Sequence, residues 1–314
     1  MQKSDKKDLL SKTHKTDSRI PLTPKGTGFA LFLSTLWGGN AVALKAGLAD
    51  APPLRIASMR FLLGGIVTII WAIWTKQKVI PNKKDIKPLL GLIAIFIPQI
   101  ALMNLGQNLT SASHAVIIAA TFPIWTGVIA HFTVPGDKLS VLRILGTFVA
   151  YAGIVVVFMQ DFTGSESTLF GDFLYLGSAI LLGLGQVYRS NTLQHVDLAK
   201  VLMTQQVIGI LAFFSLGLIF ESNPWVITER LIYSVIYQGG VIAGFGFIGN
   251  LWLLQKYRPS GVAAISMTTP IWGVVLANLV LNEPLQAMLF LGLALVIGGL
   301  SLSHWSTNRS ALKT

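Results

Sequence analysis

The chain of 314 residues contains no cysteine, so disulfide bonds, catalytic thiols and thiolate metal sites are excluded. Histidine is also scarce: the five residues are scattered along the sequence, without the spacing of metal ligands. We therefore expect neither a metal site nor a cofactor.

Charge is the second shortage. Only 12% of residues are charged and 53% are hydrophobic, whereas a soluble domain carries roughly twice that charged fraction. Several apolar runs reach the roughly 20 residues that cross a bilayer. The net charge of +11 sits in the N-terminal tail and in alternate loops rather than in one patch, which argues against nucleic acid. The expected partners are a lipid bilayer and a small-molecule substrate, with monomer and homodimer both open.

Acidic residues are rare inside the apolar runs, and we expect no carboxylate well inside any span. An enzyme embedded in the membrane would need a nucleophile, an acid pair or a metal cluster at one depth. The sequence provides none of these, so we expect that the protein is not an enzyme.

A long internal repeat is present. Residues 121–125 read Thr-Phe-Pro-Ile-Trp, and residues 268–272 read Thr-Thr-Pro-Ile-Trp. Flanking residues align at nearly the same offset, among them Gly146 with Gly292 and Gly153 with Gly299. A repeat of this length fixes the architecture before any local assignment. The pattern predicts two copies of one unit.

Hydropathy predicts ten membrane-spanning helices. They cover residues 27–48, 52–74, 88–109, 112–133, 139–160, 168–189, 198–220, 231–254, 260–281 and 285–305. This gives a first five-helix repeat at 27–160 and a second at 168–305. Residues 1–26 and 306–314 are interpreted as cytoplasmic tails, the former being too polar for a secretory signal. The connections are short, so we expect consecutive helices to be neighbours.

Loop charges predict the orientation. Every second loop is rich in lysine or arginine, as after residues 74 and 254, and the alternate loops hold acidic residues such as Asp50, Glu221 and Glu283. Basic loops stay in the cytoplasm, so both termini are expected there. Five helices per repeat is an odd number, so the repeats are inverted. The predicted fold is an all-α membrane protein with two inverted five-helix repeats, a plan of secondary transporters.

The sequence resembles the drug/metabolite transporter superfamily, specifically its ten-helix EamA-type exporters. The resemblance rests on Trp-Gly-Gly-Asn at residues 37–40 with Lys45, on Arg60-Phe61, on the proline-bearing fourth and ninth helices, and on Asn-Glu-Pro at 282–284. It implies a permease of the bacterial inner membrane that exports small polar metabolites such as amino acids by alternating access. A drug efflux carrier or a facilitative channel of the same fold is the alternative, and a membrane-embedded enzyme is less favoured.

Candidate substrate-binding residues lie at similar depths in the predicted helices. Aromatic rings offer flat apolar or cation-binding surfaces, and amides and hydroxyls can read polar groups. Small-residue packing with an asparagine bonded across helices is the competing interpretation. The candidates are Trp37, Asn40, Gln99, Thr121, Trp125, Tyr237, Thr268 and Trp272.

Two further sets follow from proline and charge. Pro123 and Pro270 fall near mid-helix at the same point of both repeats, which favours paired gating kinks over incidental ones. Arg60 is the deepest predicted intramembrane charge, and Lys45 lies nearer a helix end, where its side chain can reach the interface. His114 and His131 are possible protonation sites, but a structural histidine with satisfied hydrogen bonds is the favoured interpretation. Trp71 is interpreted as a residue of the membrane interface.

Overall fold

The described part of the chain folds into helices. The computed structural model describes residues 20–133, 141–159, 166–222, 224–257, 262 and 265–311. Within these ranges the exception is one isolated β-bridge between Ile20 and Tyr257. Seven helices there are long and apolar enough to cross a membrane, and three shorter apolar helices occupy the remaining predicted positions. The predicted all-α membrane architecture is confirmed.

The fourth and ninth predicted spans are interrupted by a turn, the eighth changes from α-helix to π-helix and back without a break, and the others are single helices. In chain order the helices are α2 (Pro24–Gly47), α3 (Pro53–Trp74), α4 (Lys83–Leu109), α5 (Ala112–Ala119), α6 (Phe122–Thr133), α7 (Val141–Met159), α8 (Glu166–Thr192), α9 (Leu198–Phe220), α10 (Glu229–Val235), the π-helix η2 (Ile236–Gly246), α11 (Phe247–Lys256), α13 (Thr269–Leu281) and α14 (Ala287–Ala311).

Helix α4 begins earlier than predicted because Asn82 and Asp85 form a capping box ahead of it. In this arrangement each side chain accepts a hydrogen bond from the other residue's backbone N–H, which satisfies two otherwise unpaired donors. Pro88, which marked the predicted start, therefore lies inside the helix. Polar first and last turns also extend α2 and α14 beyond their predicted ends, because hydropathy detects only the part of a helix that lies in lipid.

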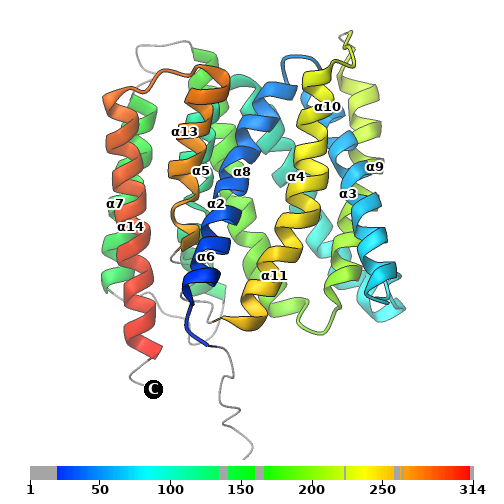
Figure 1. Ribbon diagram of the computed structural model, residues 1–314, viewed down its shortest axis with the longest axis horizontal. Helices are drawn as coiled ribbons and strands as arrows, with labels where there is room; N and C mark the ends of the chain where they lie inside the picture. The colour runs from blue at the N-terminus through cyan, green and yellow to red at the C-terminus, as the bar shows by residue number, and fades with distance from the viewer. Residues whose placement is uncertain are drawn as a thin grey trace, which may run out of the picture.

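The bundle is built mainly from contacts between the two repeats. The most extensive pairings are α7 with α14, α4 with α8, and α3 with α9. Helices α7 and α14 stand at one end of the bundle, and α3 and α9 stand at the other (Figure 1). The expectation that consecutive helices are the main neighbours is therefore wrong. Short loops fix antiparallel direction, but complementary small-residue surfaces on the other repeat decide the packing.

Glycine contacts show that corresponding helices run in opposite directions. A Cβ added to Gly153 on α7 would lie 2.8 Å from the carbonyl oxygen of Gly292 on α14, and Gly299 meets Gly146 in the same way. Gly146 corresponds to Gly292 in the repeat, and Gly153 corresponds to Gly299. The two contacts are therefore equivalent. As residue numbers rise along one helix, those of its partner fall. The repeats are therefore inverted, as predicted.

The two ends of the bundle differ in charge. The end where α2 begins and α14 ends carries the loop with Lys76 and Lys78, and we call it the basic face (Figure 1). The opposite end, the acidic face, carries Asp50, Glu221 and Glu283. Between them large apolar side chains point outward, for example Ile73 at 74% exposure, Phe132 at 80% and Leu279 at 70%. An outer surface of this kind matches lipid.

Candidate substrate site

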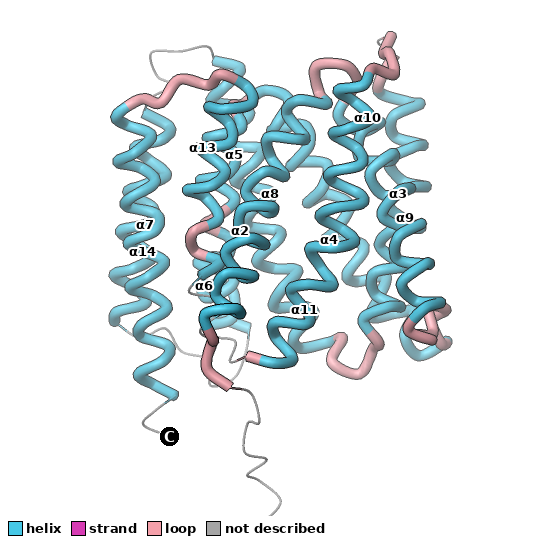
Figure 2. The backbone as a smooth tube through the Cα atoms, in the orientation of Figure 1, coloured by secondary structure: helices cyan, strands magenta, loops and turns pink. Residues whose placement is uncertain are grey.

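Both proline-bearing spans break just before the proline. Helix α5 ends at Ala119 and α6 resumes at Phe122, and α13 begins at Thr269 after a turn at residues 267–268. Figure 2 shows the second break as a short loop segment at the lower end of α13. Thr121 and Thr268 lie in the breaks, and each hydroxyl donates to a carbonyl three residues earlier, that of Ile118 at 2.6 Å and that of Ile265 at 2.7 Å. The two breaks thus have the same side-chain hydrogen bond at equivalent positions.

A glycine from the other repeat fits against each break. A Cβ on Gly38 of α2 would lie 2.7 Å from the backbone nitrogen of Gly273 and 2.8 Å from the carbonyl oxygen of Thr269. On α8, a Cβ on Gly183 would lie 2.9 Å from the nitrogen of Thr126 and 3.1 Å from the carbonyl oxygen of Phe122. These are equivalent positions of the two repeats. The broken helices are therefore held by glycine crossings rather than by side-chain interdigitation.

The tryptophans of the breaks carry unmatched donors. The indole nitrogens Nε1 of Trp125 and Trp272 are buried and find no hydrogen-bond partner in the described ranges. Trp125 packs on Tyr151 of α7 with ring centroids 5.1 Å apart. Most buried polar groups in proteins are hydrogen-bonded, so a symmetric pair of unpaired donors is a feature to explain. A polar ligand or water would satisfy them.

Three more predicted residues meet where α2 faces the eighth span. The Trp37 ring contacts Phe247 edge to face, with centroids 5.3 Å apart. The Tyr237 hydroxyl donates to the carbonyl oxygen of Leu36 at 2.8 Å, in a space that Gly39 leaves open. The amide oxygen of Asn40 is buried and has no partner among the described residues. Its helix position, two residues from Gly38, places it on the side of α2 away from α13.

Unpaired buried polar atoms also occur on α3, which carries Arg60, and on the helices that pack against it. The Nη1 atom of Arg60 is buried without a hydrogen-bond partner in the described part of the chain. One turn further along α3, a Cβ on Gly64 would meet the amide of Gln206 from α9, at 2.9 Å from Nε2. On η2, Gly239 packs against the carbonyl oxygen of Arg60, and Gln238 precedes it. The Oε1 atoms of Gln206 and Gln238 are likewise buried and unpaired.

The π-helical turn at this point is informative, because π-helices inside α-helical segments are frequent at functional sites. Helix α3 thus carries an unmatched cation and the helices packed on it carry unmatched acceptors, a combination of groups that suits a ligand with both an anionic and a cationic end. Sequence analysis found Arg60 but missed Gln206 and Gln238. Both glutamines lie in helices that are apolar overall, so hydropathy alone did not distinguish them.

The remaining predicted residues have local structural partners. Gln99 donates to Ser178 of α8 at 2.9 Å and so lies in the α4–α8 contact. Lys45 donates to the carbonyl oxygens of Gln107 and Asn108 at 3.1 and 3.2 Å, where it neutralises the C-terminal end of α4. Pro123 is exposed on the outer surface, whereas Pro270 is buried in the first turn of α13.

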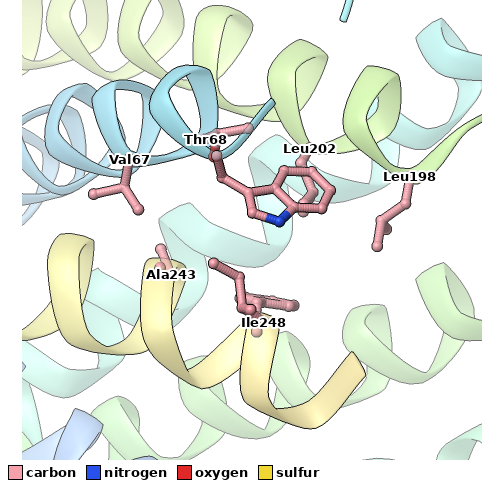
Figure 3. A pocket seen from close by; sticks show the side chains of 9 residues that line it. Val67, Thr68, Leu198, Leu202, Ala243 and Ile248 are labelled. Carbon is pink, nitrogen blue, oxygen red and sulfur yellow. The ribbon is translucent and has the colours of Figure 1, made fainter. Parts of the chain in front are cut away.

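The contacts arrange the aromatic candidates in groups along two glycine-bearing helices. Trp37, Asn40, Tyr237 and Trp272 lie around α2, whereas Trp125 lies against α8. That they line one common cavity stays a prediction. A separate apolar cleft, with an empty volume of about 310 Å³, opens among α3, α9, η2 and α11 (Figure 3). Trp71 and Phe247 line it, so Trp71 contacts other helices of the protein.

A buried carboxylate lies near the start of α8, within the sixth predicted span but close to its end. Asp172 is fully buried in α8, accepts a hydrogen bond from Thr110, and lies 2.9 Å from Nδ1 of His114. Sequence analysis did not single out Asp172. It favoured a structural role for His114, but hydropathy does not show that these two residues of different helices lie in contact.

Carboxylates of the acidic face hold helix ends and loops together. Glu221 accepts from the backbone N–H groups of Leu54 and Arg55 at 2.7 and 3.0 Å, at the start of α3. Asp50 accepts from both Nε and Nη2 of Arg230, at 2.7 and 2.6 Å. The bonds from Arg230 and from the hydroxyl of Thr228 lower the pKa of Asp50 to about 2. The acidic loop residues are thus structural as well as topological signals.

An inverted pair of five-helix units, with broken helices meeting glycines of the opposite unit, defines a membrane transport protein of the inverted-repeat class. The EamA-like transporter family matches residues 24–159 and again residues 169–305, so the two halves are matched separately. The chain belongs to the EamA-like transporter family. Expectations of a multi-pass membrane transporter are thereby confirmed.

Relatives agree with this assignment over nearly their whole length. The chain is 29% identical over 301 residues to a "Probable amino-acid metabolite efflux pump" of Escherichia coli, covering 90% of this chain and 96% of that one. It is 22% identical over 282 residues to the "Uncharacterized transporter YoaV" of Bacillus subtilis, covering 88% and 96%. A solved crystal structure superposes with a TM-score of 0.65 at 17% identity, covering 91% of this chain and 98% of that one, and supports the fold.

Proposed function

We propose that this transporter exports small zwitterionic metabolites, amino acids or close derivatives, across the bacterial inner membrane by alternating access. The observation that carries the proposal is the set of unmatched buried groups beside the duplicated breaks and on α3. The cation of Arg60 would receive a substrate carboxylate, and amide oxygens such as that of Gln206 would receive an ammonium group. The name of the Escherichia coli relative supports the substrate class.

The duplicated breaks supply a physical route to alternating access. Each break leaves a short helix segment that is tied to its neighbour by a threonine hydroxyl and by close glycine contacts. Two equivalent units in opposite orientations can adopt one another's packing, and exchanging the packings opens the same site to the other side. The lysine-rich basic face is assigned to the cytoplasm, which places both termini there.

The test is efflux from an Escherichia coli strain that lacks its own exporters of this type, loaded with dipeptides and scored for each released amino acid. Arg60→Gln should lower efflux about tenfold or more, because hydrogen bonds to a charged group contribute about 1.5–3 kcal/mol. Asn40→Leu should lower efflux while leaving the protein folded. Trp74→Leu is the matched control, since Trp74 is 85% exposed and Trp71 lines a cleft.

The result that would refute this function is release of every amino acid at the rate of the strain without the protein. Unchanged efflux in Arg60→Gln, at equal expression, would instead remove Arg60 from the site while leaving the transporter assignment intact.

A further inference from the structure

A buried acid–base pair joins three helices near the acidic face. Asp172 of α8 is 0% exposed and His114 of α5 is 4% exposed, and Oδ2 of the carboxylate lies 2.9 Å from Nδ1 of the imidazole. The other carboxylate oxygen accepts the hydroxyl hydrogen of Thr110, which follows α4. A buried carboxylate is costly unless hydrogen bonds or an opposite charge compensate it, and the contacts with Thr110 and His114 supply that compensation here.

The pair joins His114 of the first repeat to Asp172 of the second, and it occurs at only one of the two symmetry-related positions. Gly183 and Gly38 occupy equivalent positions at the two breaks. By the same difference in residue number, the residue equivalent to Asp172 is Thr27. By the difference in residue number between Thr121 and Thr268, the residue equivalent to His114 is Gly261. Neither Thr27 nor Gly261 is ionisable, and the side-chain contact near Thr27 at the basic face is a hydrogen bond of 3.0 Å between the hydroxyls of Thr23 and Tyr257. Duplication of the fold therefore does not require a titratable pair here.

The neighbouring charged groups are engaged elsewhere. Lys45 of α2 donates to carbonyl oxygens at the end of α4 and is close enough to Glu283 for electrostatic attraction. Glu283 accepts from the N–H groups of Ala112 and Ser113. On α8 itself, Tyr175 interacts electrostatically with Arg60 of α3. The titratable residue of α6, His131, lies at the opposite end of its helix.

We propose that Asp172 and His114 form a proton-binding site that couples export to the inward proton gradient; this inference rests on the proposed function. With one proton the pair is neutral overall. Without it a carboxylate remains buried with no compensating charge, which favours a conformation in which water reaches it. Because the pair bridges α4, α5 and α8, that conformation differs in the packing of the first break. A proton taken from outside would thus favour one orientation of the carrier, and its release inside would favour the other.

The experiment uses the full chain in proteoliposomes and a radiolabelled mixture of the standard amino acids. Two quantities are measured: exchange of label at equal pH on both sides, which reports transport itself, and accumulation driven by an imposed pH difference. We expect the natural protein to do both. Asp172→Asn should keep exchange and lose accumulation, and Asp172→Glu should recover part of the accumulation. Asp85→Asn is the matched control, because Asp85 is a buried carboxylate of the basic face paired with Lys200 at 3.4 Å.

Each outcome decides. Exchange without pH-driven accumulation in the natural protein would overturn the coupling site and leave the proposed function standing, whereas absence of exchange would remove the proposed function. Accumulation by Asp172→Asn at the natural level would overturn the proposal. So would loss of exchange in a folded Asp172→Asn, since the pair would then serve the transport path itself. If Asp172→Asn does not fold, the pH profiles of accumulation in Asp172→Glu and His114→Gln decide, and two unshifted profiles would overturn the proposal.

Discussion

The carboxylate of Glu283 accepts a hydrogen bond from the backbone N–H of Ala112 at 2.6 Å. The same carboxylate accepts from the N–H and the hydroxyl of Ser113, at 2.9 and 2.6 Å. The loop that follows α13 in the second repeat thereby caps α5, the first half of the broken span in the first repeat. Unpaired N–H groups at a helix start favour a negative charge, so the contact stabilises the short helix α5.

Removing this cap should destabilise the protein. Glu283→Ala is expected to lower the free energy of unfolding by about 0.5–2 kcal/mol, the range for loss of a helix cap. Thermal unfolding in detergent measures the effect. Glu229→Ala serves as a control, because Glu229 is exposed at the start of α10, where Thr228 already provides the cap. Equal melting temperatures for the two variants would contradict the capping role.

The glycine crossings should not tolerate a methyl group. Gly38→Ala and Gly183→Ala each introduce a Cβ within 2.9 Å of a backbone atom of the facing broken helix. We expect each to lose about 1–3 kcal/mol of stability, as overpacking does, and to lower transport. Gly28→Ala is the matched control on α2, because a Cβ there would meet nothing within 4 Å. If Gly38→Ala has the stability and transport rate of the natural protein, the two helices can move apart at this contact without loss of stability.

The Asp50–Arg230 contact predicts a pH dependence of stability. The pKa of Asp50 in the folded protein is lowered to about 2 from an ordinary value of 3.8, chiefly by the hydrogen bonds from Arg230 and Thr228. A lowered pKa stabilises the fold above the unfolded value, and this contribution is lost as pH falls from about 3.8 to about 2. Asp50→Asn should therefore melt below the natural protein at neutral pH, and the difference should vanish near pH 2. A constant difference across this range would mean that the contact does not depend on the carboxylate charge.

The assignment of the two faces can be tested by labelling, since the chain has no cysteine of its own. Lys78 and Ser222 are exposed loop residues on the basic and acidic faces. An impermeant thiol reagent applied to intact spheroplasts should label Ser222→Cys at once and Lys78→Cys only after lysis. The reverse order would invert the proposed topology, and the proposed direction of proton flow with it.

The repeat made much of the fold predictable. Gly146 and Gly153 aligned with Gly292 and Gly299 in the sequence, and these four residues make one contact twice. The matching segments around Thr121 and Thr268 likewise become two breaks with the same hydrogen bonds. An alignment of a chain with itself detects such features because each copy constrains the other. It also predicts the parity of the helices, from which the inversion follows.

Features that differ between the copies could not be predicted in this way. Asp172 and His114 lie in different repeats, and the residues at the equivalent positions, Thr27 and Gly261, are not ionisable, so no internal comparison connects the pair. Gln206 became a candidate only when α9 was seen against Gly64 of α3. Hydropathy assigns depth to a residue but not the helix that it faces. For this reason Gln99 was placed with the substrate, whereas it bonds to Ser178.

The doubled glycine contact between α7 and α14 has a consequence for how the two membrane faces can differ. In a dimer of two identical five-helix chains in opposite orientations, every substitution would appear on both membrane faces. A single chain that contains both units can keep the shared contact and still change one face alone. Here one face carries the hydrogen bond between the hydroxyls of Thr23 and Tyr257, and the other carries the ionisable pair Asp172 and His114. The symmetry of the two repeats thus supports the proposed exchange of their packings. The residues that differ between the repeats give each side of the membrane different chemical groups.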